Sequence, residues 1–467
     1  MPDYTSSSKT KMNRIPMVAI LLAGSFLAIL NQTLLITATP HIMLDFNLSE
    51  STGQWVTTIF MLVNGIMIPI TAFLMETYTT RRLFLISMTI FIVGTFICLV
   101  AVNFPILMVG RIVQAAAAGI MMPLMMTIFM LIFAVEKRGL AMGMAGLVIA
   151  FAPAIGPSLA GWLVDIMHWR FLFLIILPLC TIDLIFAYFY MQDIIERTFP
   201  KVDFLSIVLS VLGFGGILFG FSSVGNYGWF NAMVIISLSI GAITLVLFIR
   251  RQFKLPEPIL EFRVFKNPTF TLTTMIGMIV FMMLIAAETI LPIYMQLMAG
   301  FTALESGMMI LPGAIVMGLL SPIVGKIFDK IGARILLIIG LGIVSVTTAF
   351  FTQLTINTSL TYLTVVFAIR MVGISMVTMP ATTAGLNALP RRLIPHGTAM
   401  TNTMRQIAAS IGTATLVTVM SLGAFGSSHP EALIQGVNIA FYVATTISFI
   451  GFIMAWFVKD TVSLNQE

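Results

Sequence analysis

Apolar stretches of about 18 to 28 residues recur along the whole chain, with only short polar breaks between them. Each stretch can cross a hydrocarbon core of roughly 30 Å as a helix, because an α-helix rises about 1.5 Å per residue. A membrane barrel would need strands of about ten residues with alternating polarity, which these stretches lack. The sequence therefore predicts an all-α integral membrane protein. We expect fourteen spans, at residues 16–38, 55–75, 83–102, 106–131, 140–165, 169–191, 204–223, 231–249, 270–298, 306–327, 334–354, 360–382, 402–424 and 436–458.

The composition agrees with this prediction. Apolar residues make up 59% of the 467 residues and charged residues only 9%, whereas soluble globular chains carry about 25% charged residues. No polar stretch is long enough for a separate soluble domain of ordinary size. Cys98 and Cys180 both lie inside apolar stretches, so we expect small core residues and no disulfide.

The net charge of +6 might suggest a nucleic-acid partner, but the positions of the cations indicate a membrane topology instead. With the N-terminus inside, only Arg170 falls on the outer face, while Arg111 and Arg370 lie within spans. All other cations fall on the inner face, so both termini are expected in the cytoplasm. These cations are Lys9, Lys11, Arg14, Arg81, Arg82, Lys137, Arg138, Arg197, Lys201, Arg250, Arg251, Lys254, Arg263, Lys266, Lys326, Lys330, Arg334, Arg391, Arg392, Arg405 and Lys459.

Two features of the first half of the chain recur in the second. The loop sequence with Glu76 and Arg81 is answered by one with Asp329 and Arg334, at an offset of 253 residues. Arg111, inside the fourth span, is answered by Arg370 in the twelfth, at an offset of 259. Such internal repeats are how many transporters are built. We expect six-helix bundles at 1–200 and 266–467, with two inserted helices and a linker at 201–265.

With these motifs in register, the chain resembles the major facilitator superfamily, and specifically its fourteen-helix drug:proton antiporters. The resemblance covers essentially the whole chain. Its loop motif G-x-L-a-D-r-x-G-r-r is matched by Gly325, Asp329, Gly332 and Arg334, and in part by Ala72, Leu74, Glu76, Thr79 and Arg81. Its fourth-span motif is matched by Arg111 and Gln114, with Ala115 in place of the usual glycine. Its fifth-span motif G-x-x-x-G-P-x-x-G-G appears as Ala152, Gly156, Pro157, Ala160 and Gly161, with an additional Pro153.

The first span departs from the family pattern. The usual L-D-x-T-I-V reads LNQTLLI here, so Asn31 stands where many relatives carry aspartate and no proton site based on that acid is available. The stretch LAILNQTLLITATPHI and the sequence PILEFRVF, at 258–265, are similar to the branch of lincomycin exporters of Gram-positive bacteria. This resemblance implies a bacterial plasma membrane.

Ionisable side chains inside the spans are costly in lipid and are therefore candidates for function. Glu288 lies well inside the ninth span, one turn before Pro292, and is the first candidate to bind and release a proton. The alternative is a glutamate bonded permanently to a neighbouring helix. Asp183, in the sixth span, is the second candidate. The resemblance implies that Arg111 assists proton transfer, unless it only anchors backbone carbonyls, and we expect Arg370 to be structural.

The resemblance also assigns roles to the repeated loops and to the fifth span. Glu76, Arg81, Asp329 and Arg334 are expected to form a charge latch between the halves, although they could simply obey the positive-inside rule. Pro153, Gly156, Pro157 and Gly161 suit close packing and a hinge between the halves. For the substrate, we expect Asn31, Gln32, Trp55, Asn64 and Glu288 to place a few polar groups in an apolar central cavity, whose Met and Phe side chains adapt to different ligands.

These observations predict a proton-coupled multidrug antiporter that exports a hydrophobic or cationic amphiphile by alternating access, as a monomer among membrane lipids. No ATP-binding motif is present, so we expect no cofactor and no metal, only the proton gradient. A dedicated exporter of an endogenous metabolite or signalling nucleotide on the same fold is the alternative. An intramembrane enzyme is disfavoured because neither H-E-x-x-H nor G-x-S-x-G occurs. A channel would not need the paired loops.

Overall fold

Membrane-length helices make up nearly all of the structure. The computed structural model describes residues 14–195, 203–424 and 429–459. Fourteen helices in these ranges are long and apolar enough to cross a membrane, which confirms the prediction, and the same ranges contain no strand. These helices are α1 (Arg14–Phe46), α3 (Trp55–Thr77), α4 (Thr80–Leu99), α5 (Phe104–Ile132), α6 (Arg138–Ile166), α7 (Phe171–Tyr190), α8 (Phe204–Tyr227), α9 (Ala232–Lys254), α10 (Pro268–Leu297), α11 (Ala303–Ile331), α12 (Arg334–Phe350), α13 (Leu360–Asn387), α14 (Ile394–Gly423) and α15 (Pro430–Ala455).

Short helical turns occupy several of the connections. They are α2 (Glu50–Gly53), η1 (Val135–Lys137), η2 (Phe262–Lys266), η3 (Phe351–Gln353) and η4 (Arg391–Leu393). Four of the cations assigned to the inner face from sequence, Lys9, Lys11, Arg197 and Lys201, lie outside the described residues.

Helix α14 corrects two sequence predictions. It begins at Ile394, eight residues before the predicted start of that span, and it carries Arg405, which the sequence had assigned to the inner loops. Arg405 is instead buried within the helix. The early turns of α14 contain His396, Asn402 and several threonines, whose polarity hid the helix from a reading based on apolar length. These side chains are tolerated because they face other helices and not lipid.

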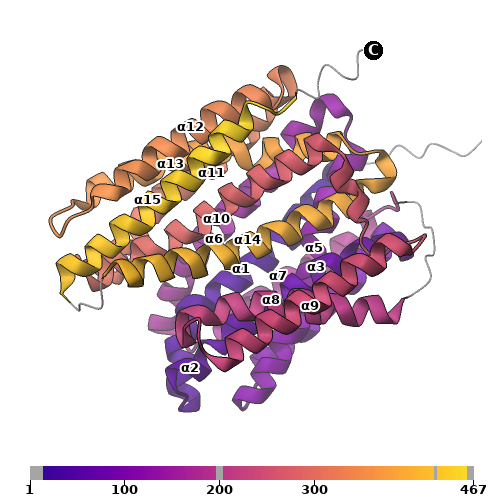
Figure 1. Ribbon diagram of the computed structural model, residues 1–467. Helices are drawn as coiled ribbons and strands as arrows, with labels where there is room; N and C mark the ends of the chain where they lie inside the picture. Colours follow the sequence, from indigo (N-terminus) through magenta and orange to yellow (C-terminus); the bar gives the residue numbers. More distant parts are fainter. Residues whose placement is uncertain (1–13, 196–202, 425–428, 460–467) are drawn as a thin grey trace, which may run out of the picture.

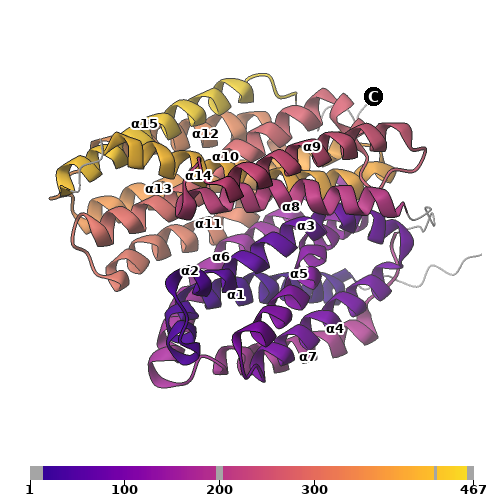
Figure 2. The ribbon, with the colours of Figure 1, turned by 60° about the horizontal axis from the view of Figure 1, so that its bottom comes forward.

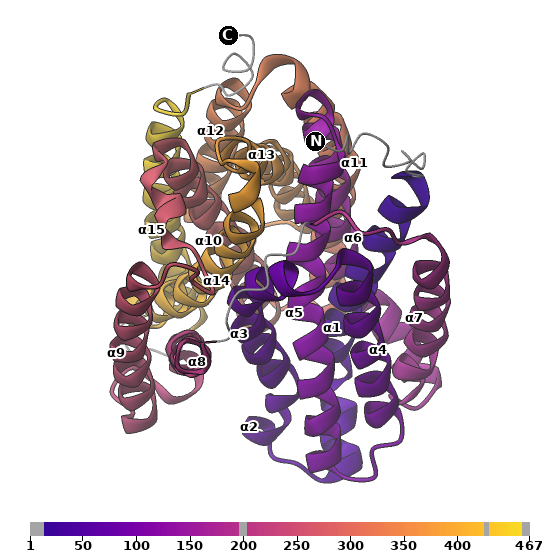
Figure 3. The ribbon, with the colours of Figure 1, turned by 90° about the vertical axis from the view of Figure 1, so that its right-hand side faces the viewer.

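The helices form two bundles. In Figure 1 the first half of the chain, in indigo and purple, lies below the second half, in orange and yellow. Helices α1 and α3 to α7 pack among themselves, and α10 to α15 do the same. Helices α8 and α9 pair with each other, and α8 contacts both α3 and α14. Figure 2 shows this pair running along the boundary between the bundles. Figure 3 shows the pair beside α3.

Polar contacts fix the inserted pair to its neighbours. Asp203 precedes α8 and pairs with Arg251 near the end of α9, at 2.6 Å. Hydrogen bonds from Arg251 lower the pKa of Asp203 to about 2, so the pair stays charged at physiological pH. The side chain of Gln252 donates to Ser206 on α8 and accepts from the backbone N–H of Ile259 in the linker. The linker is therefore tied to both inserted helices.

The bundles meet most closely where α6 crosses α11, the most extensive contact between helices of different bundles. Gly139 and Gly325 face each other at this crossing: a Cβ atom on Gly325 would lie 2.1 Å from the carbonyl oxygen of Gly139, and one on Gly139 would lie 2.3 Å from that of Gly325. One turn further along α6, Gly143 faces the backbone of Ser321. Only glycine allows the two backbones to approach this closely.

We expect Gly325→Ala to open this crossing, because the added methyl group meets backbone that cannot move aside locally. Ser321→Cys, in a background without Cys98 and Cys180, provides a reporter that is buried in the closed structure. Maleimide labelling of this cysteine should accelerate in Gly325→Ala. Gly342→Ala is the matched control, since its Cβ would meet Phe452 at an ordinary 3.5 Å. Equal labelling in both variants would refute the prediction.

Candidate functional site

Glu288 lies two-thirds of the way along α10 and is only partly buried. No hydrogen bond to its carboxylate occurs within the described residues, which disfavours the alternative of a glutamate bonded permanently to a neighbouring helix. The charge with which it interacts is that of Arg370, on α13. A carboxylate with one nearby cation and no fixed donor is free to gain and lose a proton, whereas a fully bonded one is not.

Arg370 anchors three helices near Glu288. The side chain is fully buried. Its Nη2 donates to the carbonyl oxygen of Met283 on α10 at 2.6 Å, and its Nε donates to Thr348 Oγ1 on α12 at 3.4 Å. Its Nη1 has no partner. Met283 precedes Glu288 on the same helix by little more than one turn, so Arg370 holds the segment of α10 that carries the acid.

Arg111 occupies the related position in the first bundle, with different partners. Its Nε donates to the carbonyl oxygen of Val56 on α3 at 3.1 Å, and its Nη1 donates to Gln114 Oε1 at 3.1 Å. The guanidinium also lies over the ring of Phe60, 4.2 Å from its centroid. The contact with Val56 is the one that the anchoring alternative predicts. Within the described residues no acidic side chain pairs with Arg111.

A chain of amides continues from Arg111 to α1. Gln114 Nε2 donates to Thr95 Oγ1 at 2.9 Å and lies 3.5 Å from Asn31 Oδ1. Asn31 is almost fully buried, and its Nδ2 has no partner. Asn31 therefore joins a hydrogen-bonded network with Gln114 and Arg111 of the fourth-span motif.

Asp183 lies inside the first bundle, away from this network. Only 6% of the residue is exposed, and Oδ2 has no hydrogen-bond partner. A Cβ atom on Gly24 of α1 would lie 3.1 Å from that oxygen. No charged group acts on Asp183, so the structure does not bring it together with Arg111 or Glu288.

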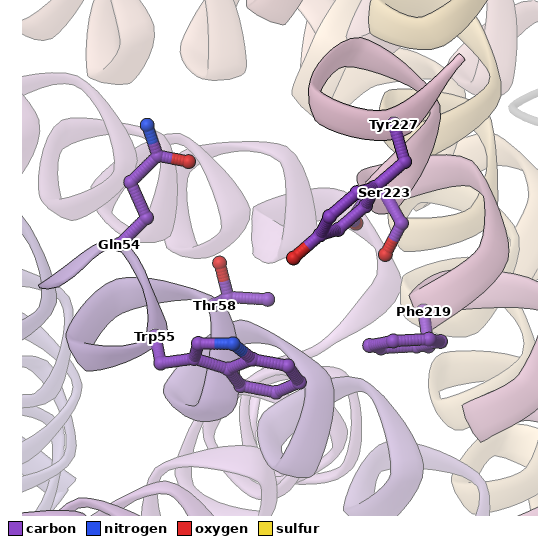
Figure 4. Close-up of a pocket in the computed structure, with 7 residues that line it drawn as sticks. Gln54, Trp55, Thr58, Phe219, Ser223 and Tyr227 are labelled. Carbon is purple, nitrogen blue, oxygen red and sulfur yellow. The ribbon is translucent and has the colours of Figure 1, made fainter. Parts of the chain in front are cut away.

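The residues expected to line a central cavity lie in different parts of the structure. Trp55, at the start of α3, stacks on Phe219 of α8, with ring centroids 5.7 Å apart. Figure 4 shows these rings at the edge of a small pocket with Gln54, Thr58, Ser223 and Tyr227, between the first bundle and the inserted pair. Gln32 and Asn64 are partly buried on α1 and α3. Trp55 thus faces α8, and Glu288 faces Arg370 on α13.

The antiporter motif of α6 faces α1 rather than the other bundle. A Cβ atom on Gly156 would lie 2.1 Å from Thr33 Oγ1, and the same hydroxyl lies 3.3 Å from the carbonyl oxygen of Ala152. Gly161 has only Thr37 near its Cβ position, at 3.9 Å. Pro153 and Pro157 lie inside α6, which continues through both. The close approach at Gly156 lies within the first bundle, while the crossing with α11 uses Gly139 and Gly143, earlier in α6.

Two of the four latch residues join the bundles, at the end of the molecule that we call the basic end, where the loops with Arg81, Arg138 and Arg391 lie. Asp329, on α11, accepts from the backbone N–H groups of Gly139 at 2.7 Å and Leu140 at 3.0 Å. The carboxylate caps the first turn of α6, where free N–H groups and the helix dipole favour an anion.

Glu76 makes the second contact. Its Oε1 lies 2.9 Å from Nε2 of His396 on α14. Nδ1 of the same ring accepts from the backbone N–H of Glu261 in the linker, at 3.3 Å. Because Nδ1 is an acceptor, we assign the proton of a neutral ring to Nε2, which donates to Glu76. His396 thus connects the first bundle, the second bundle and the linker.

Of the two latch arginines, Arg81 bonds within its own bundle. Arg81 donates to the carbonyl oxygen of Tyr188, and its backbone N–H donates to Asp193, both within the first bundle. Arg334 begins α12 with an exposed side chain. Sequence reasoning missed the residues that bond across the bundles beside the two acids, namely His396, Gly139, and the pair of Arg138 Nη1 and Asn387 Oδ1 at 2.7 Å. No motif marks them, and they meet only when the helices pack.

Comparison with known proteins agrees with this architecture. The Major Facilitator Superfamily profile matches residues 21–413. The chain is 55% identical over 458 residues to the uncharacterized MFS-type transporter YcnB of Bacillus subtilis, covering 97% of each chain. It is 42% identical over 470 residues to the lincomycin resistance protein LmrB of the same organism, covering 98% of each. Among solved structures, the human organic anion transporter MFSD10 matches with a TM-score of 0.71 at 13% identity, over 95% of this chain and 99% of that one.

The chain therefore belongs to the Major Facilitator Superfamily. It is a multi-pass membrane transporter and not an enzyme. Its relatives include proteins named for lincomycin resistance and for multidrug export, which agrees with the family that the sequence motifs predicted.

We expect Asp329→Asn to weaken the closure of the basic end, because asparagine keeps only one acceptor oxygen and its NH₂ group, a donor, would face one of the two N–H groups of α6. Spin labels are attached at Arg82→Cys and Arg392→Cys, both exposed positions. Double electron–electron resonance between the two labels then measures the separation of the bundles. The distance distribution should shift to longer values in Asp329→Asn. Asp193→Asn is the control, since its carboxylate also accepts a backbone N–H but within one bundle. An unchanged distribution in Asp329→Asn would contradict the prediction.

His396→Ala should destabilise the closed structure by about 1–3 kcal/mol, because it leaves the Glu76 carboxylate and the Glu261 N–H without their partners. The measurement is the melting temperature of the purified protein in detergent. His168→Ala is the control: His168 pairs with Asp45 at 3.6 Å on an exposed surface at the opposite end, where ion pairs contribute little. Equal melting temperatures for the two variants would rule out the bridging role of His396.

Proposed function

We propose that this protein is a proton-coupled antiporter that exports hydrophobic or amphiphilic drugs by alternating access. The observation that carries the proposal is Glu288, a partly buried carboxylate inside a membrane helix with a single nearby cation and no hydrogen-bond donor within the described residues. Protonation neutralises Glu288 and removes the attraction between its carboxylate and the Arg370 guanidinium. Proton binding therefore changes the charge balance inside the second bundle. Relatives named for lincomycin resistance and multidrug export support drugs as the substrate class.

The cations at the basic end determine the orientation that we propose for the protein in the membrane. We place it, with both chain termini, in the cytoplasm of a bacterial cell, because cations concentrate on that side of membrane proteins. The protein would act as a monomer, surrounded by lipid. In this orientation the contacts of Asp329 and His396 close the cytoplasmic side. Opening toward the cytoplasm then requires that α6 and α11 separate at Gly139 and Gly325.

The proton gradient supplies enough energy without a nucleotide or any other cofactor. One elementary charge crossing roughly 100 mV releases about 2.3 kcal/mol, which corresponds to a roughly fifty-fold concentration gradient of substrate. A pH difference adds to this. We assign the coupling to Glu288, with Asp183 as the second candidate, since it is also buried and lacks a partner at Oδ2. Arg111 assists through the network with Gln114 and Asn31.

The test is export of a lincosamide and of a fluorescent dye from proteoliposomes, driven by an imposed pH gradient. Glu288→Gln should abolish gradient-driven accumulation while leaving drug binding and drug–drug exchange intact, because glutamine imitates the protonated acid. Glu305→Gln is the matched control, since this glutamate only caps α11 at its exposed first turn. If Glu288→Gln transports normally and Asp183→Asn does not, the proton site moves to Asp183.

A dedicated metabolite or signalling-nucleotide exporter on the same fold predicts another outcome. In that case lincosamide and dye would move slowly or not at all, whereas extracts of the producing cells would compete for binding. Flux that ignores the gradient in wild-type protein would refute antiport altogether.

A further inference from the structure

The inserted helices α8 and α9 form one packing unit, to which neither the family motifs nor the proton mechanism gives a role. Gly216 and Gly241 face each other where the two helices cross: a Cβ atom on Gly216 would lie 2.8 Å from the Cα atom of Gly241. At the basic end, the ion pair of Asp203 and Arg251 joins the same two helices. Because the backbones leave no room for a side chain between them, we treat α8 and α9 as a single pair.

One face of α8 enters the seam between α3 of the first bundle and α14 of the second. We call this the α3–α14 seam and locate it by Gly65 on α3 and Gln406 on α14. A Cβ atom on Gly65 would lie 2.4 Å from Leu218 Cδ1 on α8 and 3.2 Å from Gln406 Cγ. Leu218 fills the space beside Gly65, with only 3% of the residue exposed. Three helices from separate parts of the chain therefore meet at this glycine.

Two further contacts attach the inserted pair to both bundles, near the end opposite the basic end. Trp55 of α3 stacks on Phe219 of α8, as Figure 4 shows. Trp229 lies in the turn at 228–231 between α8 and α9, and its indole N–H donates to Thr418 Oγ1 on α14 at 2.7 Å. Buried apolar side chains of α8, α9 and α14 pack around this indole. The pair is thus bound to the first bundle on one side and to the second on the other.

The remaining faces of the pair are apolar and exposed. Leu212, six residues before Leu218 on α8, is 46% exposed, and Ile236 and Ile243 on α9 are exposed as well. Figure 3 shows α9 on the far side of α8 from α3. In a membrane protein, exposed apolar side chains of this kind face acyl chains. Helix α8 therefore lies between the lipid and the α3–α14 seam.

Packing and polar contacts must hold the pair in place. The hydrophobic effect does not do so within the bilayer, because lipid tails are as apolar as the side chains of α8. The fit of Leu218 against Gly65 and the hydrogen bond between Trp229 and Thr418 are contacts of these two kinds. A void beside Gly65 would forfeit dispersion contacts, so an acyl chain would enter it if Leu218 did not.

We propose that the inserted pair is a lateral seal, in which α8 keeps acyl chains, and hydrophobic solutes dissolved among them, out of the α3–α14 seam. This inference goes beyond the proposed function, since it depends on neither the substrate nor the proton site. The competing interpretation is that α3 and α14 close the seam by themselves and that α8 and α9 are only attached to its surface. In that case, loosening α8 admits no lipid.

The experiment uses the full-length protein in lipid nanodiscs that contain a phosphatidylcholine with a diazirine in one acyl chain. Light attaches this chain to the residues that it touches, and mass spectrometry of peptides locates the label. In the wild type we expect label on the exposed faces of α8 and α9 and none at Gly65 or Gln406. Leu218→Ala should bring label to both positions, because the truncation opens the space beside Gly65. Leu212→Ala is the matched control, since it makes the same change on a face that already meets lipid.

Thr418→Val tests the second anchor with Leu218 intact. It removes the acceptor of the Trp229 indole while the side chain keeps a similar size, so the fold should be retained and the turn between α8 and α9 should loosen. We expect label to appear at Ala414, which is buried beside this turn. Thr446→Val is the control, because this exposed hydroxyl bonds within its own helix, α15. If Leu218→Ala does not fold, Thr418→Val decides the question by itself.

Label at the seam in the wild type, in neither variant, or equally in the controls would overturn the proposal and leave α8 and α9 as a surface attachment. Label in one variant alone supports the seal and assigns it to that contact. The labelling needs neither a drug nor a proton gradient, so it fails independently of the proposed function. If a pH gradient drives export while labelling ignores both variants, antiport stands and the seal falls. If labelling changes as expected but no gradient drives export, the seal stands and antiport falls.

Discussion

The two bundles touch backbone to backbone where Gly139 meets Gly325, and the closed state of the protein depends on this contact. Side chains larger than hydrogen at either position would hold α6 and α11 apart. The crossing also brings the first turn of α6 within reach of Asp329, whose carboxylate accepts from two of its backbone N–H groups. Packing and capping therefore act at the same place, and a motion that breaks one breaks the other.

Three arginines are buried inside the membrane-length helices, and each has different surroundings. Arg111 is surrounded by neutral acceptors and an aromatic ring, in a network that includes Asn31. Arg370 shares its charge with Glu288 while it anchors α10. Arg405 donates to two neutral oxygens of α13, and its Nε is buried without a partner. Since an isolated charge is expensive in a low-dielectric interior, each of the three guanidinium groups donates to buried oxygen acceptors of neighbouring helices.

Arg111 lies in the first bundle, on α5, whereas Arg370 and Arg405 lie in the second, on α13 and α14. In the first bundle, Asp183 and Asn31 are enclosed among their own helices, and Gly156 fixes α1 against α6. In the second bundle, Glu288 and Arg405 both face α13 through the helices that carry them. His396 bonds to Glu76 of the first bundle and to Glu261 of the linker.

The sequence by itself determined the membrane class, the fourteen helices and the concentration of cations at one end, because lipid forces the backbone into helices whose length and apolar character are visible in one dimension. It also located Glu288, since a carboxylate in an apolar stretch is conspicuous. It missed the early start of α14, because His396, Thr398 and Thr401 make the first turns polar in a helix that faces protein rather than lipid. Only the tertiary structure decided that Asp329 caps α6, that Glu76 meets His396 from 320 residues away, and that Trp55 faces α8. The rotation of each helix about its axis selects these partners, and that rotation depends on glycine contacts between segments far apart in the chain, which hydropathy does not encode.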